Sequence, residues 1–173
     1  MPLLDPSELR WNVKRLALSK GDLGVEETID QMRLLVAEAP KFPELKALAT
    51  KISQGVPPGD SLSLFNRLQT WSKYRVQYLF DSPVFEEVTG VGLMLERLQK
   101  YGSIAGDCDC VSIFQASLAR ALNLPVRFVT IATGKRGIDF THVFPEVYAG
   151  GAWRSLDVFA PRAMRVRTRY WRI

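Results

Sequence analysis

The apolar residues of the first hundred positions recur every three or four residues, which is the spacing of an amphipathic helix. A Pro- and Gly-rich loop interrupts them at residues 54–60, and Asp60 or Ser61 can cap the helix that follows. Two stretches, residues 9–18 and 74–80, have the composition of strands. The pattern therefore predicts helices over residues 25–39, 42–52, 61–71 and 91–102.

The pattern is clearer after Gly106. An apolar stripe repeats at helical spacing over residues 108–122, and Asn123 followed by Pro125 is typical of a helix end. The segments after this helix have strand composition and are separated by Gly-containing loops. Helices first and antiparallel strands afterwards indicate an α+β fold. The strands predicted in this way cover residues 126–132, 139–148 and 153–159.

The length and composition predict one soluble globular domain. A chain of 173 residues is long enough for one ordinary core and too short for two, and 47% of its residues are hydrophobic. No apolar run approaches the roughly 18–20 residues that span a bilayer, and the N-terminus lacks the pattern of a secretion signal. We expect a helical part over about residues 24–101, a central helix and sheet over about 106–160, and a tail over about 161–173, with no membrane contact.

The net charge of +5 is concentrated in the C-terminal part of the chain. Residues 152–173 hold six arginines and a single acid, Asp157, whereas the rest of the chain is balanced. Alternating arginines predict an edge strand with a charged outer face. They also fit a contact with nucleic acid or an acidic partner, to which Tyr170 and Trp171 would add stacking surfaces. No helix-turn-helix or zinc-finger pattern accompanies them.

The only two cysteines, Cys108 and Cys110, lie at the start of the predicted central helix. Their spacing is poor for a disulfide, and two thiols with a single histidine are too few ligands for a zinc site. We therefore expect neither metal nor cofactor. The helix dipole and the first-turn amides favour the thiolate of Cys108 and lower its pKa. Cys110 lies about 200° further around the axis, so the two side chains cannot face one cleft.

The single histidine, His142, is predicted to share a sheet face with Asp157. Gly150 and Gly151 fit the centre of a two-residue hairpin turn, and a symmetric hairpin would place Phe144 opposite Asp157. Side chains two positions apart share a face, so Asp157 would lie diagonal to His142. The inference requires an even loop, and a bulge at Pro145 would reverse it.

The stretch "GDCDCVSIFQASLARALNLPVRF" resembles the nucleophile segment of the transglutaminase-like cysteine hydrolase superfamily, and "THVFPEVYAGGAWRSLDVF" resembles its downstream block. The resemblance covers about residues 25–160, and the upstream part is similar to transglutaminase-like proteins of tailed phages and prophages. It implies a papain-like core in which the nucleophile helix packs on an antiparallel sheet. The matched positions imply a nucleophile at Cys108, a histidine at His142 and an acid at Asp157. Four positions depart from the family's pattern. Cys110 replaces the usual second Asp, Ser112 a small Ala, Pro145 a strand hydrophobe, and Val158 the Pro that usually follows the acid.

The resemblance implies a cysteine protease or amidase that acts on a protein or peptide through a thioester, in the host cytoplasm or in a virion. The oxyanion would bind the backbone amide of Cys108. A second donor stays open among Gln77, Tyr78 and Tyr101. We interpret Asp107 as an N-cap and Asp109 as a solvated first-turn acid.

Two other functions stay open. A crosslinking transglutaminase would use the same residues with an amine in place of water. A virion or assembly scaffold could keep the fold without the reaction.

Overall fold

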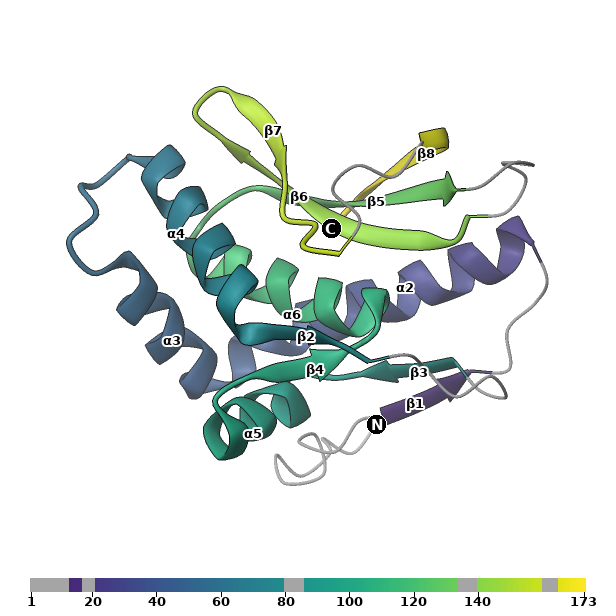
Figure 1. Ribbon diagram of the computed structural model, residues 1–173, viewed down its shortest axis with the longest axis horizontal. Coiled ribbons are helices and arrows are strands. Elements are labelled where there is room, and N and C mark those ends of the chain that lie inside the picture. The colour runs from purple at the N-terminus through teal and green to yellow at the C-terminus, as the bar shows by residue number, and fades with distance from the viewer. Residues whose placement is uncertain (1–12, 17–20, 80–85, 134–139, 160–164) are drawn as a thin grey trace.

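The computed structural model describes residues 13–16, 21–79, 86–133, 140–159 and 165–173 (Figure 1). Helices dominate the first part of the chain and strands the last part. In chain order the elements are β1 (Val13–Leu16), α2 (Asp22–Glu38), the short 3₁₀ helix η1 (Ala39–Lys41), α3 (Pro43–Ser53), α4 (Ser61–Arg75), β2 (Val76–Tyr78), β3 (Glu86–Thr89), α5 (Val91–Tyr101), β4 (Ile104–Gly106), α6 (Cys108–Ala121), β5 (Val126–Thr133), β6 (His142–Ala149), β7 (Ala152–Ser155) and β8 (Arg165–Arg172).

The helix α6 is the centre of the molecule. It packs against one face of an antiparallel sheet with strand order β7-β6-β5-β8, and α2, α3 and α4 surround its other sides (Figure 1). Every residue from Asp109 to Ala119 is buried. Two small sheets complete the fold: β1 pairs antiparallel with β3, and β2 pairs parallel with β4. This architecture confirms the predicted α+β class.

Both ends of α6 form as the sequence predicts. The Asp107 carboxylate accepts a hydrogen bond from the Cys110 N–H at 3.2 Å, which satisfies one of the open amides of the first turn. At the other end Asn123 adopts the left-handed conformation, with φ of 58°. The start of the helix is thus fixed at Cys108, with the N-cap as the single residue between β4 and α6.

Close packing requires a glycine just before this helix. A Cβ at Gly106 would lie 2.8 Å from the Cβ of Cys110 and 3.0 Å from the Cε of Met94. Gly106 also pairs with Tyr78 across the β2–β4 ladder. The absence of a side chain therefore lets β4 approach the first turn of α6 and aim the chain into it.

The hairpin between β6 and β7 has the predicted even register. Gly150 and Gly151 form its turn with φ of 57° and 79°, and Glu146 pairs with Ser155. The N–H of Leu156 donates to the carbonyl of Pro145 at 3.0 Å, which continues the same register past the end of β7. Pro145 therefore introduces no bulge between these two strands.

Most predicted elements are present, with shifts of up to four residues at their ends. The strand expected over 74–80 is reduced to β2, and its last position, Phe80, lies outside the described residues. Residues 9–12 and 17–18 of the predicted N-terminal strand, 134–137 of the loop after β5 and Asp139 of the strand predicted over 139–148 also lie outside the described residues. Sequence reasoning missed β3 and β4 because strands of three or four residues give almost no periodic signal.

The C-terminal strand β8 is the predicted edge strand and pairs with β5. Two of its described side chains contact other elements. Arg169 forms an ion pair of 3.1 Å with Glu26 of α2, and the Trp171 indole donates to the hydroxyl of Thr130. A deletion of residues 163–173, made to test whether the tail binds nucleic acid or an acidic partner, would therefore also remove part of the sheet. The acidic partner or nucleic acid expected there stays a prediction.

Candidate active site

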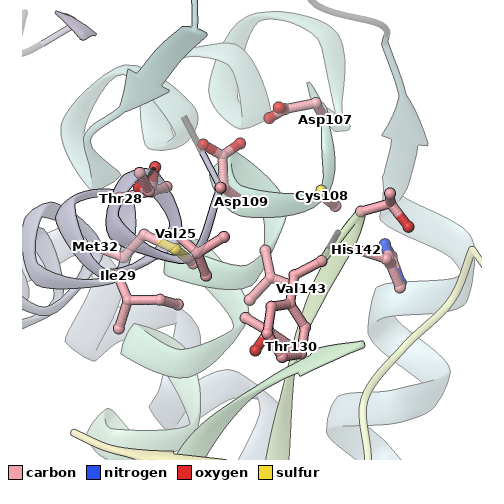
Figure 2. A pocket seen from close by; sticks show the side chains of 14 residues that line it. Val25, Thr28, Ile29, Met32, Asp107, Cys108, Asp109, Thr130, His142 and Val143 are labelled. Atoms are coloured by element: carbon pink, nitrogen blue, oxygen red, sulfur yellow. Dashed lines mark hydrogen bonds between the residues drawn. The ribbon is translucent and has the colours of Figure 1, made fainter. Parts of the chain in front are cut away.

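Cys108 is the first residue of α6, and its side chain lines a pocket of about 330 Å³ at the N-terminal end of the helix. The pocket lies between α2, the first turn of α6 and the adjoining strands β5 and β6. Figure 2 shows Cys108 and His142 on one side of it, with Val25, Ile29 and Met32 of α2 on the other. The thiol is partly exposed, so a substrate can reach it from the pocket.

His142 is the first residue of β6 and lines the same pocket. Its backbone position is set by the ladder with β5, because β7 pairs with β6 only over residues 146–149. At this point the ladder places Ile131 opposite His142. The imidazole is therefore held at the strand end that faces the start of α6.

Asp157 follows β7 and contacts the imidazole directly. Its Oδ2 lies 2.9 Å from the Nε2 of His142, and its Oδ1 accepts the Phe159 N–H at 2.9 Å. A carboxylate only accepts hydrogen bonds, so Nε2 carries the proton in this contact. The side chain of Asp157 is only 2% exposed and that of His142 10% exposed. The second ring nitrogen, Nδ1, is then the basic one.

Cys110 points to the opposite side of the first turn, into the core. It is 3% exposed, and its sulfur accepts the backbone N–H of Thr89 at 3.2 Å. Burial raises the pKa of the Cys110 thiol far above its usual range, and the carboxylates of Asp109 and Asp107 add to the rise. Both cysteines lie in the described part of the chain, and neither forms a disulfide. The prediction that Cys110 faces the core is confirmed.

Asp109 is not the solvated acid that the sequence indicated. It is 2% exposed, and its Oδ1 accepts the Cys110 N–H at 2.7 Å. A carboxylate at the helix start is drawn to the open amides, and residues of α2 line the same pocket beside this turn. Asp107 has the predicted role of N-cap.

The ligand atoms of Asp107, Asp109 and Cys110 lie within 4.8 Å of one another. These atoms do not fit a metal site well. A cysteine binds a metal as the thiolate, and the burial of Cys110 keeps it protonated. One oxygen of each carboxylate already accepts the Cys110 amide.

The three candidates for a second oxyanion donor lie on two elements near the segment that leads into Cys108, which are β2 for Gln77 and Tyr78 and α5 for Tyr101. The parallel ladder pairs Gln77 with Ala105 and Tyr78 with Gly106, so β2 runs beside the segment that leads into Cys108. The Tyr78 ring contacts Phe159 edge-on, at 4.7 Å between centroids. Tyr101 ends α5 at the other end of β4 and is 67% exposed. None of the three lines the pocket.

Two buried polar residues of α6 were not singled out as functional from the sequence. The hydroxyl of Ser112 lies 3.1 Å from the carbonyl oxygen of Val143, and the amide of Gln115 donates to the carbonyl of Leu156 at 3.1 Å. A signal was present, since both are polar positions in an apolar helix at helical spacing from Cys108.

The profile of the transglutaminase-like superfamily matches residues 46–158, which is well over half of the chain, and the protein belongs to that superfamily. The matched segment includes Cys108, His142 and Asp157. Among solved structures, a candidate cysteine protease from Cytophaga hutchinsonii is similar at 23% identity with a TM-score of 0.48. The similarity covers 73% of this chain and 42% of that protein, so the chain spans less than half of it.

A comparison with curated proteins finds no match. Among the described helices, none combines the length and apolar character needed to cross a membrane.

Proposed function

We propose that this protein is a cysteine hydrolase that cleaves an amide bond in a protein or peptide through a thioester intermediate. Cys108 is the nucleophile, His142 the general base and acid, and Asp157 the residue that orients the imidazole. The proposal extends to the setting implied by the sequence resemblance, a phage or prophage product acting in the host cytoplasm or in a virion.

One observation carries the proposal. Cys108 and His142 line a single pocket, and the Oδ2 of Asp157 lies 2.9 Å from the Nε2 of the imidazole. The three side chains come from α6, β6 and the segment after β7, so no single local motif brings them together. The acid fixes the tautomer in which Nδ1 can accept a proton, which is the arrangement that nucleophilic catalysis by a thiol requires.

The reaction follows from these roles. The Nδ1 of His142 takes the thiol proton, and the sulfur of Cys108 attacks the acyl carbonyl. The same imidazole then protonates the leaving amine, which leaves a thioester on Cys108. Water, deprotonated by His142, hydrolyses the thioester and restores the thiol.

The oxyanion of each tetrahedral intermediate is stabilised by the backbone N–H of Cys108, the first amide of α6, with the positive end of the helix dipole behind it. For the second donor we favour Tyr78 over Gln77 and Tyr101, although its side chain does not line the pocket here and would have to turn its hydroxyl toward Cys108. Its ring contacts Phe159, two residues after Asp157, and its strand borders the approach to Cys108. Tyr78→Phe removes only the hydroxyl and is expected to reduce kcat by about 10²-fold if this assignment holds.

Two products separate hydrolysis from acyl transfer. Purified protein is incubated with unfolded casein and a fluorescent primary amine, and the mixture is analysed by gel and mass spectrometry. Fragments that depend on Cys108 identify a hydrolase, whereas fluorescence on intact casein identifies an amine transferase. Cys108→Ala is the inactive control and Cys110→Ala the matched one. If neither product forms and both thiols are alkylated equally slowly, the proposal is contradicted and a scaffold is favoured.

A further inference from the structure

One face of α6 carries three polar side chains on successive turns. Cys108, Ser112 and Gln115 are spaced by four and three residues, so they lie one below another on the helix. Ser112 is 2% exposed and Gln115 1% exposed. A buried polar group costs free energy unless it forms a hydrogen bond, so the partners of these two side chains account for their place in the core.

The partner of Ser112 is next to His142. Its hydroxyl lies 2.5 Å from the carbonyl oxygen of Cys108, one turn above, and 3.1 Å from the carbonyl oxygen of Val143, so its single hydrogen is shared between a bond within the helix and one to β6. The contact therefore joins the helix, directly below the thiol, to the second residue of β6. In the family pattern this position holds a small apolar residue, so the tether depends on this chain's own serine.

The partner of Gln115 is next to Asp157. Its Nε2 donates to the carbonyl oxygen of Leu156 at 3.1 Å, and the Leu156 N–H donates to Pro145 of β6 at 3.0 Å. Leu156 is fully buried. The residue before the acid is thus fixed to the helix on one side and to the sheet on the other.

We propose that Ser112 and Gln115 are positioning residues that set the distance from the Cys108 thiol to His142 and to Asp157. The inference rests on the proposed function, because it assigns how that site is assembled. Neither side chain touches the reacting atoms. They act by preventing α6 from sliding along the β6–β7 hairpin, since a misplacement of about 1 Å can reduce a rate by roughly 10²-fold.

The helix supplies a matched control. Ser117 is as buried as Ser112, and its hydroxyl makes no hydrogen bond within the described part of the chain. Ser112→Ala and Ser117→Ala therefore remove the same atom from the same helix, with and without a partner on the hairpin. Gln115→Met keeps the length of the side chain and removes its donor.

The first readout is the alkylation rate of Cys108 by iodoacetamide at about pH 6, where an ordinary thiol is almost fully protonated. Cys110 is replaced by alanine throughout. We expect Gln115→Met to slow the reaction about tenfold and Ser112→Ala severalfold, while Ser117→Ala matches the parent. Ser112→Thr, which keeps the hydroxyl, should retain most of the rate.

The second readout is the ¹⁵N spectrum of the only imidazole in the chain, recorded with Cys108→Ala under mildly alkaline conditions. Chemical shifts of the two ring nitrogens show which of them carries the proton. The parent should show the proton on Nε2, and Gln115→Met should show a mixture of the two tautomers. A residue that only stabilises the fold would leave this spectrum unchanged.

The outcomes distinguish a failure of the proposed function from a failure of the positioning role. If Cys108 of the parent reacts no faster than an ordinary thiol, the proposed function fails. If the parent is activated but Ser112→Ala and Gln115→Met keep its rate and spectrum with only a lower melting temperature, the positioning role is wrong and the proposed function stands. Equal slowing by Ser117→Ala would also overturn the positioning role.

Discussion

The first turn of α6 holds two thiols in opposite environments. Cys108 lines the pocket together with His142, whereas Cys110 is buried beneath Thr89 in the core. Both lie within the same turn, near the same helix dipole and the same open amides. What separates them is their direction from the helix axis.

The difference shows that a helix start alone does not activate a cysteine. A helix dipole contributes about 0.3–1 kcal/mol, up to about 2 kcal/mol in favourable geometries. Desolvation of a fully buried group shifts a pKa by up to about 3–5 units, which is about 4–7 kcal/mol. Burial therefore dominates at Cys110 and raises its pKa despite the dipole. The proposed activation of the Cys108 thiol therefore has to come mainly from its access to the pocket and from the imidazole of His142.

The largest expected contrast is in activity. Cys108→Ala should reduce kcat/KM by at least about 10³-fold because it removes the atom that forms the thioester. Cys110→Ala should leave kcat/KM within about threefold of the parent, since this side chain faces away from the pocket. Steady-state kinetics on both variants, with folding checked by circular dichroism, tests the pair. Similar losses in both would remove the distinction between the two sides of the turn.

On the core side, the tight approach of β4 should make Gly106 indispensable for stability. Gly106→Ala places a methyl group 2.8 Å from the Cβ of Cys110, and overpacking of this kind costs about 1–3 kcal/mol. Urea unfolding measures the loss. An unchanged unfolding midpoint would mean that the first turn of α6 is packed less closely than described.

The buried thiol should also make the protein less stable in alkali. In the unfolded chain Cys110 loses its proton above about pH 8.5, whereas in the folded chain its raised pKa keeps it protonated. The folded state then binds more protons, so the free energy of unfolding falls by about 1.4 kcal/mol per pH unit, or about 2 kcal/mol between pH 8.5 and 10.

Unfolding curves of the parent and of Cys110→Ala at several pH values isolate this effect, because all other groups are common to both proteins. The stabilisation that burial gives the neutral thiol is fully present below about pH 8.5 and is lost above it. Parallel pH profiles for the two proteins would show that Cys110 is not buried as a neutral thiol.

The smallest effect is expected outside the pocket, where β8 contacts α2. Arg169 and Glu26 are both about half exposed, so breaking the pair with Arg169→Glu should cost about 0.5 kcal/mol. Adding Glu26→Arg should recover it. Arg172→Glu changes the same charge on the same strand without a described ion pair and serves as the control. Equal losses in the two single variants would point to net charge rather than to this contact.

Local chemistry made much of the fold predictable. Asp107 before the apolar stripe and Asn123 with Pro125 after it marked both ends of α6 correctly, because caps are encoded by adjacent residues. Gly150 and Gly151 marked the β6–β7 turn, and the period of two along a strand then gave the register. The contact between His142 and Asp157 follows from that register.

Features that depend on distant partners could not be predicted in the same way. The parallel pairing of β2 with β4 joins two three-residue strands whose sequences give no sign of each other. Asp109 stands at a position typical of a solvated first-turn acid, and its burial depends both on its bond to the Cys110 amide and on α2, which lines the same pocket and is distant in the sequence. Likewise, the acceptors of Ser112 and Gln115 that lie outside α6 are carbonyl groups 31 and 41 residues away.

The most direct test of the central claim is the alkylation rate of each cysteine as a function of pH, resolved by peptide mapping. The account predicts that Cys108 reacts rapidly at about pH 6, that Cys110 reacts only after unfolding, and that His142→Ala or Asp157→Asn removes most of the advantage of Cys108. Rates for Cys108 that rise only near the usual thiol pKa of about 8.5, unaffected by these substitutions, would contradict it.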